Sequence, residues 1–401
     1  MVPNPPMPHH VFLHVPKTAG STLRTVLSRQ YGARHVLYFD LGHGDPRPMA
    51  DMLAQARARA GTQDIRLYTG HQYLGLHAAL GEPCLYFTLL RDPVERALSE
   101  YFYAFSYPHH AQRAEILSGA LGPMEFLTRR HAGGNAQAQQ IGGRTQRPLL
   151  EAALANLQHA IAAVGVAEDF ERSLLLIARR LGWAPPVHVA RNVTRLDAAQ
   201  EAARAEARAQ AAAHRGLFAT DQALHAAARA RLDADCAAEG AAFDSALAAF
   251  HRCQAALAEG AGDAVFERYE FRGDDALPPW AAAVLAGPDY AEVAAFLAQP
   301  PRPISAPVNL MGQVARVEGG LVQGWATDLF ATRPVTLRLM AGETPLGATR
   351  AQLFHPGPEA ARFARGCCGF RLRLPEAAPG KLRLVVDGTN IALPDPDRLL
   401  G

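Results

Sequence analysis

Apolar and polar positions follow two different periods in the first half of the chain. Four segments have the short apolar or alternating pattern of β-strands: 10–15, 64–69, 84–90 and 160–166. One of them, CLYFTLL at 84–90, is almost continuously apolar, as expected for a strand buried on both faces of a parallel sheet. Apolar residues recur at three- and four-residue spacing over 20–31 and 168–182, which predicts amphipathic helices. Strands that alternate with helices predict an α/β domain with a parallel sheet.

The middle of the chain, residues 197–260, is alanine-rich with arginine and glutamate interspersed. These residues favour helices by intrinsic propensity, and apolar positions such as Leu224 and Phe250 indicate that the helices pack. We therefore expect a helical extension that completes a first domain over 9–260. Prolines gather over 261–307 around a short helical patch, and this composition predicts a connector.

The last part of the chain, 308–401, changes to a period of two. Alternating runs such as VTLRLMA and KLRLVV are accompanied by the hairpin signals Gly319-Gly320 and Asp387-Gly388. This pattern predicts a small antiparallel β-sandwich. The large aromatic side chains of Trp325 and Phe370 either fill its core, which we expect, or form a platform that stacks on sugars.

The composition allows folded cores and restricts the classes of partner. The chain has 401 residues, 49% of them apolar and 19% charged, which suits two or three domains with hydrophobic cores. Its formal net charge of +2 is close to neutral, so we expect no general nucleic-acid binding. Oligomeric state leaves no recognisable signature in the pattern.

Cysteine use and apolar runs indicate the compartment. The five cysteines form no CxxC pair and no zinc spacing, so we expect reduced thiols and no metal. No apolar run is long enough to cross a membrane, and the first residues, MVPNPPMPHH, lack the basic and apolar regions of a signal peptide. We therefore expect a cytoplasmic protein without a transmembrane segment.

The first predicted strand runs into PKTAGST, residues 16–22, before the first helix begins. A helix amino terminus offers unpaired backbone N–H groups and the positive end of the helix dipole, which together attract anions. Lys17 adds a compact positive charge, and Gly20 lets backbone approach a ligand closely. Further hydrogen bonds can come from three hydroxyl side chains: Thr18, Ser21 and Thr22. The loop therefore predicts an anion site, most simply for a phosphate.

Two other interpretations of this loop stay open. It could be an ordinary strand–turn–helix in which a serine or threonine caps the helix. It could also serve a nucleotide enzyme, but the Walker A pattern GxxxxGK[ST] is absent because Lys17 comes before Gly20. Nucleotide hydrolysis is therefore not our first choice.

A second stretch, RDPVERALSEYFYAF, predicts a helix with a well-defined start. Asp92 stands at the N-cap position, Pro93 suits the first helical position, and Glu95 completes a capping box. We expect Arg96 on the solvated face of this helix, because charged side chains are mostly exposed.

Charged side chains follow three of the predicted strands. Arg91 follows CLYFTLL, and its flexible side chain can share one phosphate with Ser99, about 10 Å further along the helix. His71 follows the strand 64–69 after a glycine; a lone histidine is more often structural, but this position favours function. Because ligands lie outside the carboxyl ends of parallel strands, we expect Lys17, His71 and Arg91 at one edge of the sheet.

Together these stretches resemble the sulfotransferases of the heparan sulfate 2-O-sulfotransferase type, including their bacterial relatives. In that family a PKTAGT-like loop binds the 5′-phosphosulfate of 3′-phosphoadenosine 5′-phosphosulfate (PAPS), and an RDPxxRxxSxYxY segment binds its 3′-phosphate. This chain has PKTAGST and RDPVERALSEYFY, and Gly70-His71 matches the step that carries the family's catalytic histidine. Softer similarities in NAQAQQIGG, VGVAEDFERSLLLIARRLGW and ARNVTR extend the resemblance over 9–260.

The resemblance implies a role for each matching residue. The 5′-phosphosulfate would be held by the loop residues Lys17, Thr18, Ala19, Gly20, Ser21 and Thr22. The 3′-phosphate would be held by Arg91 and Ser99. His71 would act as the base and Lys17 would stabilise the leaving group. The implied fold is a P-loop-like parallel sheet flanked by helices.

The implied reaction moves a sulfuryl group from PAPS, a co-substrate, to a hydroxyl group of an acceptor, without a metal ion. We expect a glycan or glycolipid as acceptor, although the acceptor-binding residues of animal members do not align and those members are membrane-anchored. Residues 308–401 lie outside the resemblance. Two other functions stay open: an ATP-dependent P-loop-like kinase, and a non-catalytic glycan-binding scaffold with a decayed sulfotransferase fold.

Overall fold

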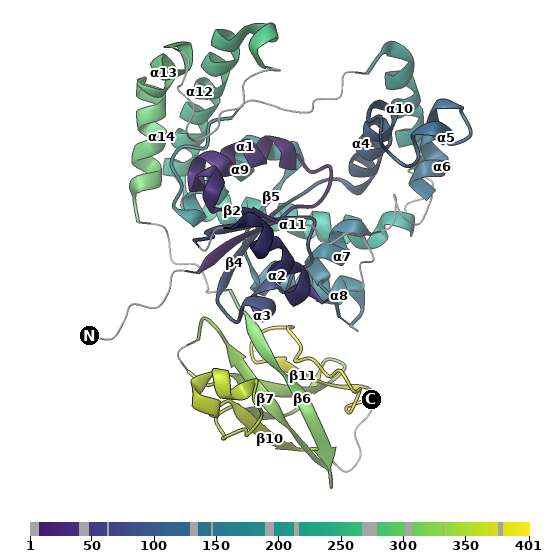
Figure 1. The fold of residues 1–401 in the computed structure, drawn as a ribbon, viewed down its shortest axis with the longest axis vertical. Helices are drawn as coiled ribbons and strands as arrows, with labels where there is room; N and C mark the ends of the chain where they lie inside the picture. Colours follow the sequence, from purple (N-terminus) through teal and green to yellow (C-terminus); the bar gives the residue numbers. More distant parts are fainter. Residues whose placement is uncertain are drawn as a thin grey trace.

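The structure, a computed structural model, describes residues 8–39, 48–61, 64–128, 135–145, 147–188, 196–211, 216–266, 279–300, 307–331, 333–375 and 380–401. Five strands form a parallel sheet in the order β2-β3-β1-β4-β5: β1 (His9–Leu13), β2 (Val36–Tyr38), β3 (Leu67–Gly70), β4 (Cys84–Leu90) and β5 (Ile161–Val166). Helices flank this sheet in Figure 1. The prediction of an α/β domain with a parallel sheet is therefore confirmed.

Helices connect the strands and surround the sheet. The first nine are α1 (Gly20–Tyr31), α2 (Met49–Ala60), α3 (Leu76–Leu80), α4 (Pro93–Ser106), α5 (Arg113–Leu117), α6 (Pro123–Thr128), α7 (Ala136–Gly142), α8 (Leu149–His159) and α9 (Phe170–Leu181). The alanine-rich segment forms α10 (Ala198–Ala211), α11 (Ala219–Glu239) and α12 (Ala241–Phe266). Two shorter helices follow, α13 (Pro279–Leu285) and α14 (Pro288–Ala298).

The order of the strands creates a switch point between β1 and β4. From β1 the chain passes through α1 to β2 on one side of the sheet, whereas from β4 it passes to β5 on the other side. Strands β1 and β4 are parallel neighbours, and the connections that follow them lead toward opposite edges of the sheet. In open α/β sheets, ligands bind outside the carboxyl ends of the strands at such a switch point.

Burial explains why the central strands read as continuous apolar runs. Val11, Phe12 and Leu13 of β1 are fully buried, and every residue of β5 is buried. Burial on both faces removes the alternation that marks a half-exposed strand. Strand β2 was not predicted, because its three residues are too few for a period, and β3 begins at Leu67 instead of residue 64.

Part of the predicted connector belongs to the first core. Ala281 of α13 and Val293 and Phe296 of α14 are buried in the same hydrophobic cluster as the parallel sheet. Within the described part of the chain, no single helix is long and apolar enough to span a membrane. Helices α13 and α14, bent by 53° relative to each other, pass that test only as a pair and only by length and composition.

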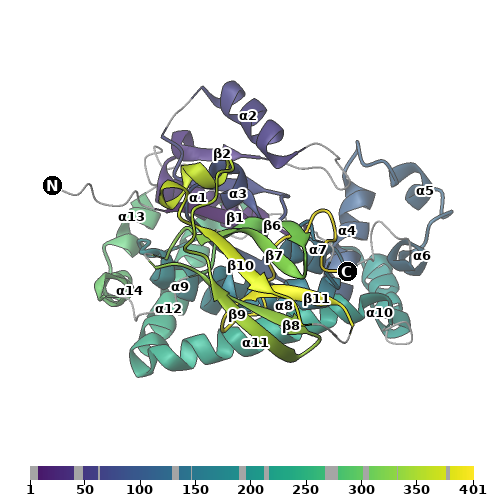
Figure 2. The same cartoon turned by 90° about the horizontal axis from the view of Figure 1, so that it is seen from below.

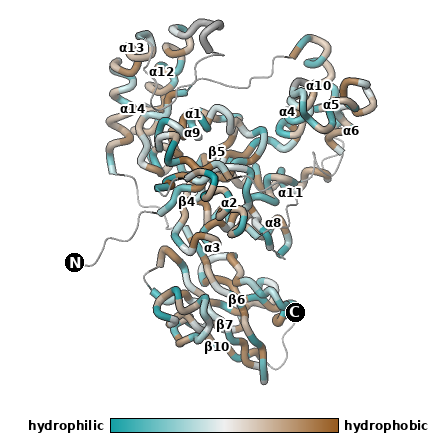
Figure 3. The backbone as a smooth tube through the Cα atoms, in the orientation of Figure 1, coloured by the Kyte–Doolittle hydropathy of each residue, from teal (hydrophilic) through white to brown (hydrophobic). Residues whose placement is uncertain are grey.

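The last part of the chain forms two separate antiparallel sheets. One has the order β10-β7-β6, with β6 (Leu310–Glu318), β7 (Leu321–Asp328) and β10 (Gly369–Arg373); the other has the order β11-β8-β9, with β8 (Thr336–Ala341), β9 (Thr344–Arg350) and β11 (Leu382–Val386). Both sheets contribute to one hydrophobic cluster, and Figure 3 shows apolar and polar positions mixed along their strands.

Two expectations about these sheets are confirmed. Gly319 and Gly320, with φ of 56° and 72°, form the two-residue turn between β6 and β7, as hairpins with two left-handed positions require. Trp325 and Phe370 are only 4% and 2% exposed, so both fill cores, and the alternative of a sugar-stacking platform is wrong for them.

The antiparallel sheets contact the amino ends of the parallel strands. The backbone N–H of Val308 donates to the carbonyl of His159, just before β5, at 2.8 Å. The side-chain carbonyl of Asn309 accepts from the N–H of Cys84, the first residue of β4, at 2.6 Å. Figure 1 shows these sheets below the parallel sheet, and Figure 2, seen from below, shows them in front of it. They therefore lie at the opposite edge from the carboxyl ends.

Candidate functional site

The three strand-end residues singled out in the sequence lie at one edge of the parallel sheet. Lys17 follows β1, His71 follows β3 and Arg91 follows β4, and these strands are adjacent in the order β3-β1-β4. A guanidinium N–H of Arg91 donates to the carbonyl oxygen of Lys17 at 3.1 Å. The loop after β1 and the segment after β4 are thus in direct contact.

The loop after β1 has an unusual backbone. Lys17 and Ala19 have φ of 67° and 65°, in the left-handed region that residues other than glycine seldom adopt. Turns with left-handed residues are typical of the concave arrangements of N–H groups that bind anions. Ala19 is the N-cap of α1 and offers no side-chain hydrogen bond to the helix. The interpretation of this loop as a turn capped by serine or threonine is therefore wrong.

The hydroxyl residues of this loop differ in their surroundings. Thr18 is fully buried, and its hydroxyl donates to the carbonyl of Val15 at 2.8 Å, so it shapes the loop from inside. Ser21 is half-buried and Thr22 is buried, both in the first turn of α1. Of the three hydroxyls, those of Ser21 and Thr22 stand at the helix amino terminus, where an anion would bind.

Gly20 also has a packing role that the sequence did not indicate. A Cβ atom placed on Gly20 would lie 1.9 Å from Nε2 of His14, so the imidazole fills the space that a side chain would need. The ring of His14 is also 4.7 Å from that of His71, centroid to centroid, and stacks on Phe12 at 5.3 Å. Sequence reasoning missed His14, which links the start of α1 to the candidate base.

Lys17 is held among aromatic and charged side chains of α4. Its ammonium nitrogen lies 4.0 Å from the centre of the Tyr103 ring. Burial lowers the pKa of Lys17 to about 8; the carboxylate of Glu100 opposes this shift, and the positive charges of Arg91 and Arg96 add to it. Lys17, Arg91 and Arg96 thus bring three positive charges close together, and such a group attracts anions.

Arg96 is buried, contrary to our expectation of a solvated position. It is 2% exposed, and its guanidinium donates to the carboxylate of Glu100 one turn later at 2.9 Å. Ser99 lies three residues after Arg96 and four before Tyr103, so all three share one face of α4. Tyr103, on this face, contacts Lys17.

The start of α4 matches the prediction only in part. The carboxylate of Asp92 accepts the N–H groups of Val94 and Glu95 at 3.0 and 2.9 Å, as an N-cap does. Glu95 does not complete a capping box, because its carboxylate instead pairs with Arg204 and Arg208 of α10.

Glu168, two residues after β5, makes that missing contact instead. It accepts the N–H of Asp92 at 2.7 Å and a hydrogen bond from His225 at 3.2 Å. Burial raises the pKa of Glu168, but hydrogen bonds from His225, from the Asp92 backbone and from its own backbone, with the charge of His225, lower the pKa to about 2. Burial lowers the pKa of Arg91, whereas Glu95 and Glu168 raise it.

Helix α7 joins the ends of all three strands, and sequence reasoning gave it no role. Gln137 binds both backbone polar groups of Arg91. Gln140 donates to the carbonyls of His14 and Gln72 at 3.2 and 3.1 Å. The only signal was the soft family similarity of NAQAQQIGG, because single glutamines have no periodic pattern.

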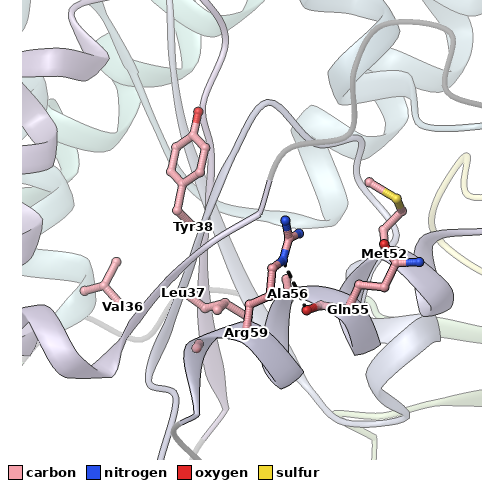
Figure 4. Close-up of a pocket in the computed structure, with 8 residues that line it drawn as sticks. Val36, Leu37, Tyr38, Met52, Gln55, Ala56 and Arg59 are labelled. Carbon is pink, nitrogen blue, oxygen red and sulfur yellow. Dashed lines mark hydrogen bonds between the residues drawn. The ribbon is translucent and has the colours of Figure 1, made fainter.

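One pocket in the described part of the chain lies away from these strand ends. Figure 4 shows a pocket of about 620 Å³ between β2, at the edge of the sheet, and α2. It is lined by Val36, Leu37, Tyr38, Met52, Gln55, Ala56, Arg59 and Ala60, and contains none of the predicted site residues. Across the described ranges, no three His, Cys, Asp or Glu side chains are grouped to hold a metal ion.

Comparison with known proteins adds no assignment: neither a protein-family model nor a curated protein matches this chain.

Proposed function

We propose that this protein is a sulfotransferase that uses PAPS and modifies a hydroxyl group of a glycan or glycolipid. The observation that carries the proposal is the meeting, at one edge of a parallel sheet, of a helix amino terminus with a lysine, an arginine and a histidine: Lys17, Arg91 and His71. The sequence resemblance supports the same conclusion independently of the strand order.

The residues at this edge fit a ligand with two anionic groups. The first turn of α1, with Lys17, Ser21 and Thr22, suits the 5′-phosphosulfate. Arg91 and Ser99 suit the 3′-phosphate, and the contact between Arg91 and the Lys17 carbonyl keeps the two subsites adjacent. The nearby carboxylate of Glu95 is paired with Arg204 and Arg208, which limits its repulsion of a phosphate.

PAPS supplies an activated sulfuryl group in this reaction. His71 takes the proton of the acceptor hydroxyl as the oxygen–sulfur bond forms. The bond between sulfur and the bridging oxygen breaks at the same time, and 3′-phosphoadenosine 5′-phosphate leaves. Lys17 and the N–H groups of α1 stabilise the negative charge that develops on the bridging oxygen, as preorganised donors do in phosphoryl transfer.

The finer features of the fold and compartment belong to the same proposal. We infer that the β1–loop–α1 unit is a P-loop-like anion site and that the two C-terminal sheets pack as a β-sandwich around their shared cluster. The five cysteines are free thiols, which fits a reducing compartment such as the cytoplasm.

The test is calorimetric titration with 3′-phosphoadenosine 5′-phosphate, AMP and ATP, without added metal, for the wild type and Arg91→Ala. We expect 3′-phosphoadenosine 5′-phosphate to bind at least about tenfold more tightly than AMP, and this preference to collapse in the variant. Equal binding of 3′-phosphoadenosine 5′-phosphate and AMP by the wild type would overturn the proposal. Magnesium-dependent binding of ATP would favour a kinase instead.

A further inference from the structure

One side chain holds the backbone of Arg91 at both of its polar groups. The side-chain carbonyl of Gln137 accepts the N–H of Arg91 at 2.9 Å, and its amide N–H donates to the carbonyl of Arg91 at 2.7 Å. Arg91 is the first residue beyond β4, whose paired register with β5 ends at Leu90. The glutamine thus continues the hydrogen bonding of the strand by one residue and fixes the direction in which the arginine side chain leaves.

Gln137 is itself immobilised. It is fully buried in the first turn of α7, and its backbone N–H donates to one carboxylate oxygen of Asp221 at 3.2 Å. The N–H of Ala138 donates to the other oxygen at 2.8 Å, and the N–H of Asp221 donates to the side chain of Asn135 at 3.1 Å. Asp221 is 1% exposed, so a buried carboxylate on α11 anchors the helix that holds Arg91.

We propose that Gln137 is a positioning residue that sets the guanidinium of Arg91 for a 3′-phosphate and thereby the preference for ligands that carry one. This inference rests on the proposed function. An amide suits both partners at once, because Arg91 presents one donor and one acceptor. A glutamate would place an acceptor oxygen against the carbonyl oxygen of Arg91, and a methionine would make neither hydrogen bond.

The experiment measures the ratio of the dissociation constants of AMP and 3′-phosphoadenosine 5′-phosphate by calorimetry. In Gln137→Met we expect this ratio to fall about tenfold or more, because the charge-assisted contact of Arg91 with the 3′-phosphate is lost. A loss of stability alone would weaken the binding of both ligands or of neither, and would leave the ratio of their dissociation constants unchanged. Gln137→Asn, whose amide is one methylene shorter, provides a second variant if Gln137→Met does not fold.

Gln30 offers a matched control. Its side chain makes the same pair of hydrogen bonds, both of 3.1 Å, with the N–H and carbonyl of Ala184, but it lies in the last turn of α1, away from the strand ends. We expect Gln30→Met to leave the ratio unchanged. In an Arg91→Ala background, adding Gln137→Met should also change nothing, because the group that it positions is gone.

The outcomes separate this inference from the proposed function. In one outcome the wild type prefers the ligand with a 3′-phosphate while Gln137→Met keeps the same ratio. That result would overturn the inference and leave the proposed function standing. A wild type without the preference would overturn the proposed function. A further fall in the ratio in the Arg91→Ala background would show that Gln137 acts through another group, which also contradicts the inference.

Discussion

The imidazole of His14 occupies the space in which a side chain on residue 20 would have to lie. Nε2 of His14 is 1.9 Å from the position of a Cβ on Gly20, closer than two atoms that are not bonded can approach. Because His14 also contacts His71, the missing side chain at Gly20 lets one ring connect the start of α1 with the candidate base. The glycine is thus needed for packing between site residues.

Gly20→Ala should therefore destabilise the protein and weaken anion binding. Overpacking of this kind costs about 1–3 kcal/mol, measured as a fall in the free energy of unfolding in urea. Gly122→Ala is the matched control, since a Cβ there meets no atom within 4 Å. Adding His14→Ala should restore part of the stability lost in Gly20→Ala. Equal stability of the Gly20→Ala and Gly122→Ala variants would show that His14 moves aside at no cost.

Binding of 3′-phosphoadenosine 5′-phosphate should weaken as the pH rises above 8. The pKa of Lys17 is lowered to about 8 by burial, so the side chain is charged below this pH and loses its charge above it. A bound polyanion favours the charged form, so binding near pH 8 takes up protons. Calorimetry in two buffers of different ionisation enthalpy measures this uptake, and we expect about a tenfold loss of affinity between pH 7 and pH 9.

Lys17→Arg is the control for this pH dependence, because arginine stays charged throughout the range. Its binding should be weaker overall and nearly independent of pH between 7 and 9. If the wild type binds equally well at pH 7 and pH 9 with no proton uptake, Lys17 does not contact the ligand.

His71 and Lys17 should have different effects when they are removed. His71→Ala should lower turnover by about 10²- to 10⁴-fold and leave the affinity for 3′-phosphoadenosine 5′-phosphate within about twofold, because a base contacts the acceptor. Lys17→Ala should lower both turnover and this affinity, since the lysine contacts the co-substrate in the ground state and in the transition state. Release of 3′-phosphoadenosine 5′-phosphate from PAPS measures turnover. His251→Ala, at an exposed position on α12, is the control. Near-normal turnover in His71→Ala would remove it from the mechanism.

The sequence predicts the strands and helices that place the site, because their signals are local. The helix over 20–31 is found at Gly20–Tyr31, and the apolar run at 84–90 is β4. What it cannot predict depends on residues that are distant in the sequence. Arginine is a residue type that is mostly exposed, yet Arg96 is buried where α4 packs against the loop after β1. Gln137 has no local signal, since its partner is 46 residues away.

His77 lies at the junction between the parallel sheet and the C-terminal sheets. It is buried; Nδ1 accepts from the hydroxyl of Tyr86 at 2.8 Å, and Nε2 donates to the carbonyl of Leu310 at 3.3 Å. This assignment follows from the carbonyl, which can only accept. Burial lowers the pKa of His77 to about 4, and the hydrogen bond to Leu310 opposes that shift.

Acid should therefore destabilise the protein through His77. An unfolded histidine has a pKa of about 6.5, so between pH 6.5 and pH 4 the unfolded state binds a proton that the folded state does not. The stability contributed by neutral His77 is complete above pH 6.5 and is lost as the pH falls, by about 1–2 kcal/mol between pH 7 and pH 5. Urea unfolding at both pH values measures it.

His77→Gln tests whether this residue causes the loss. Glutamine retains a donor that reaches the Leu310 carbonyl but does not titrate, so the variant should be less stable at pH 7 and lose less stability on going to pH 5. His10 and His188 also have pKa values lowered to about 4 by burial, so some acid sensitivity will persist. A variant that loses as much stability as the wild type would show that other buried groups, and not His77, cause the acid sensitivity.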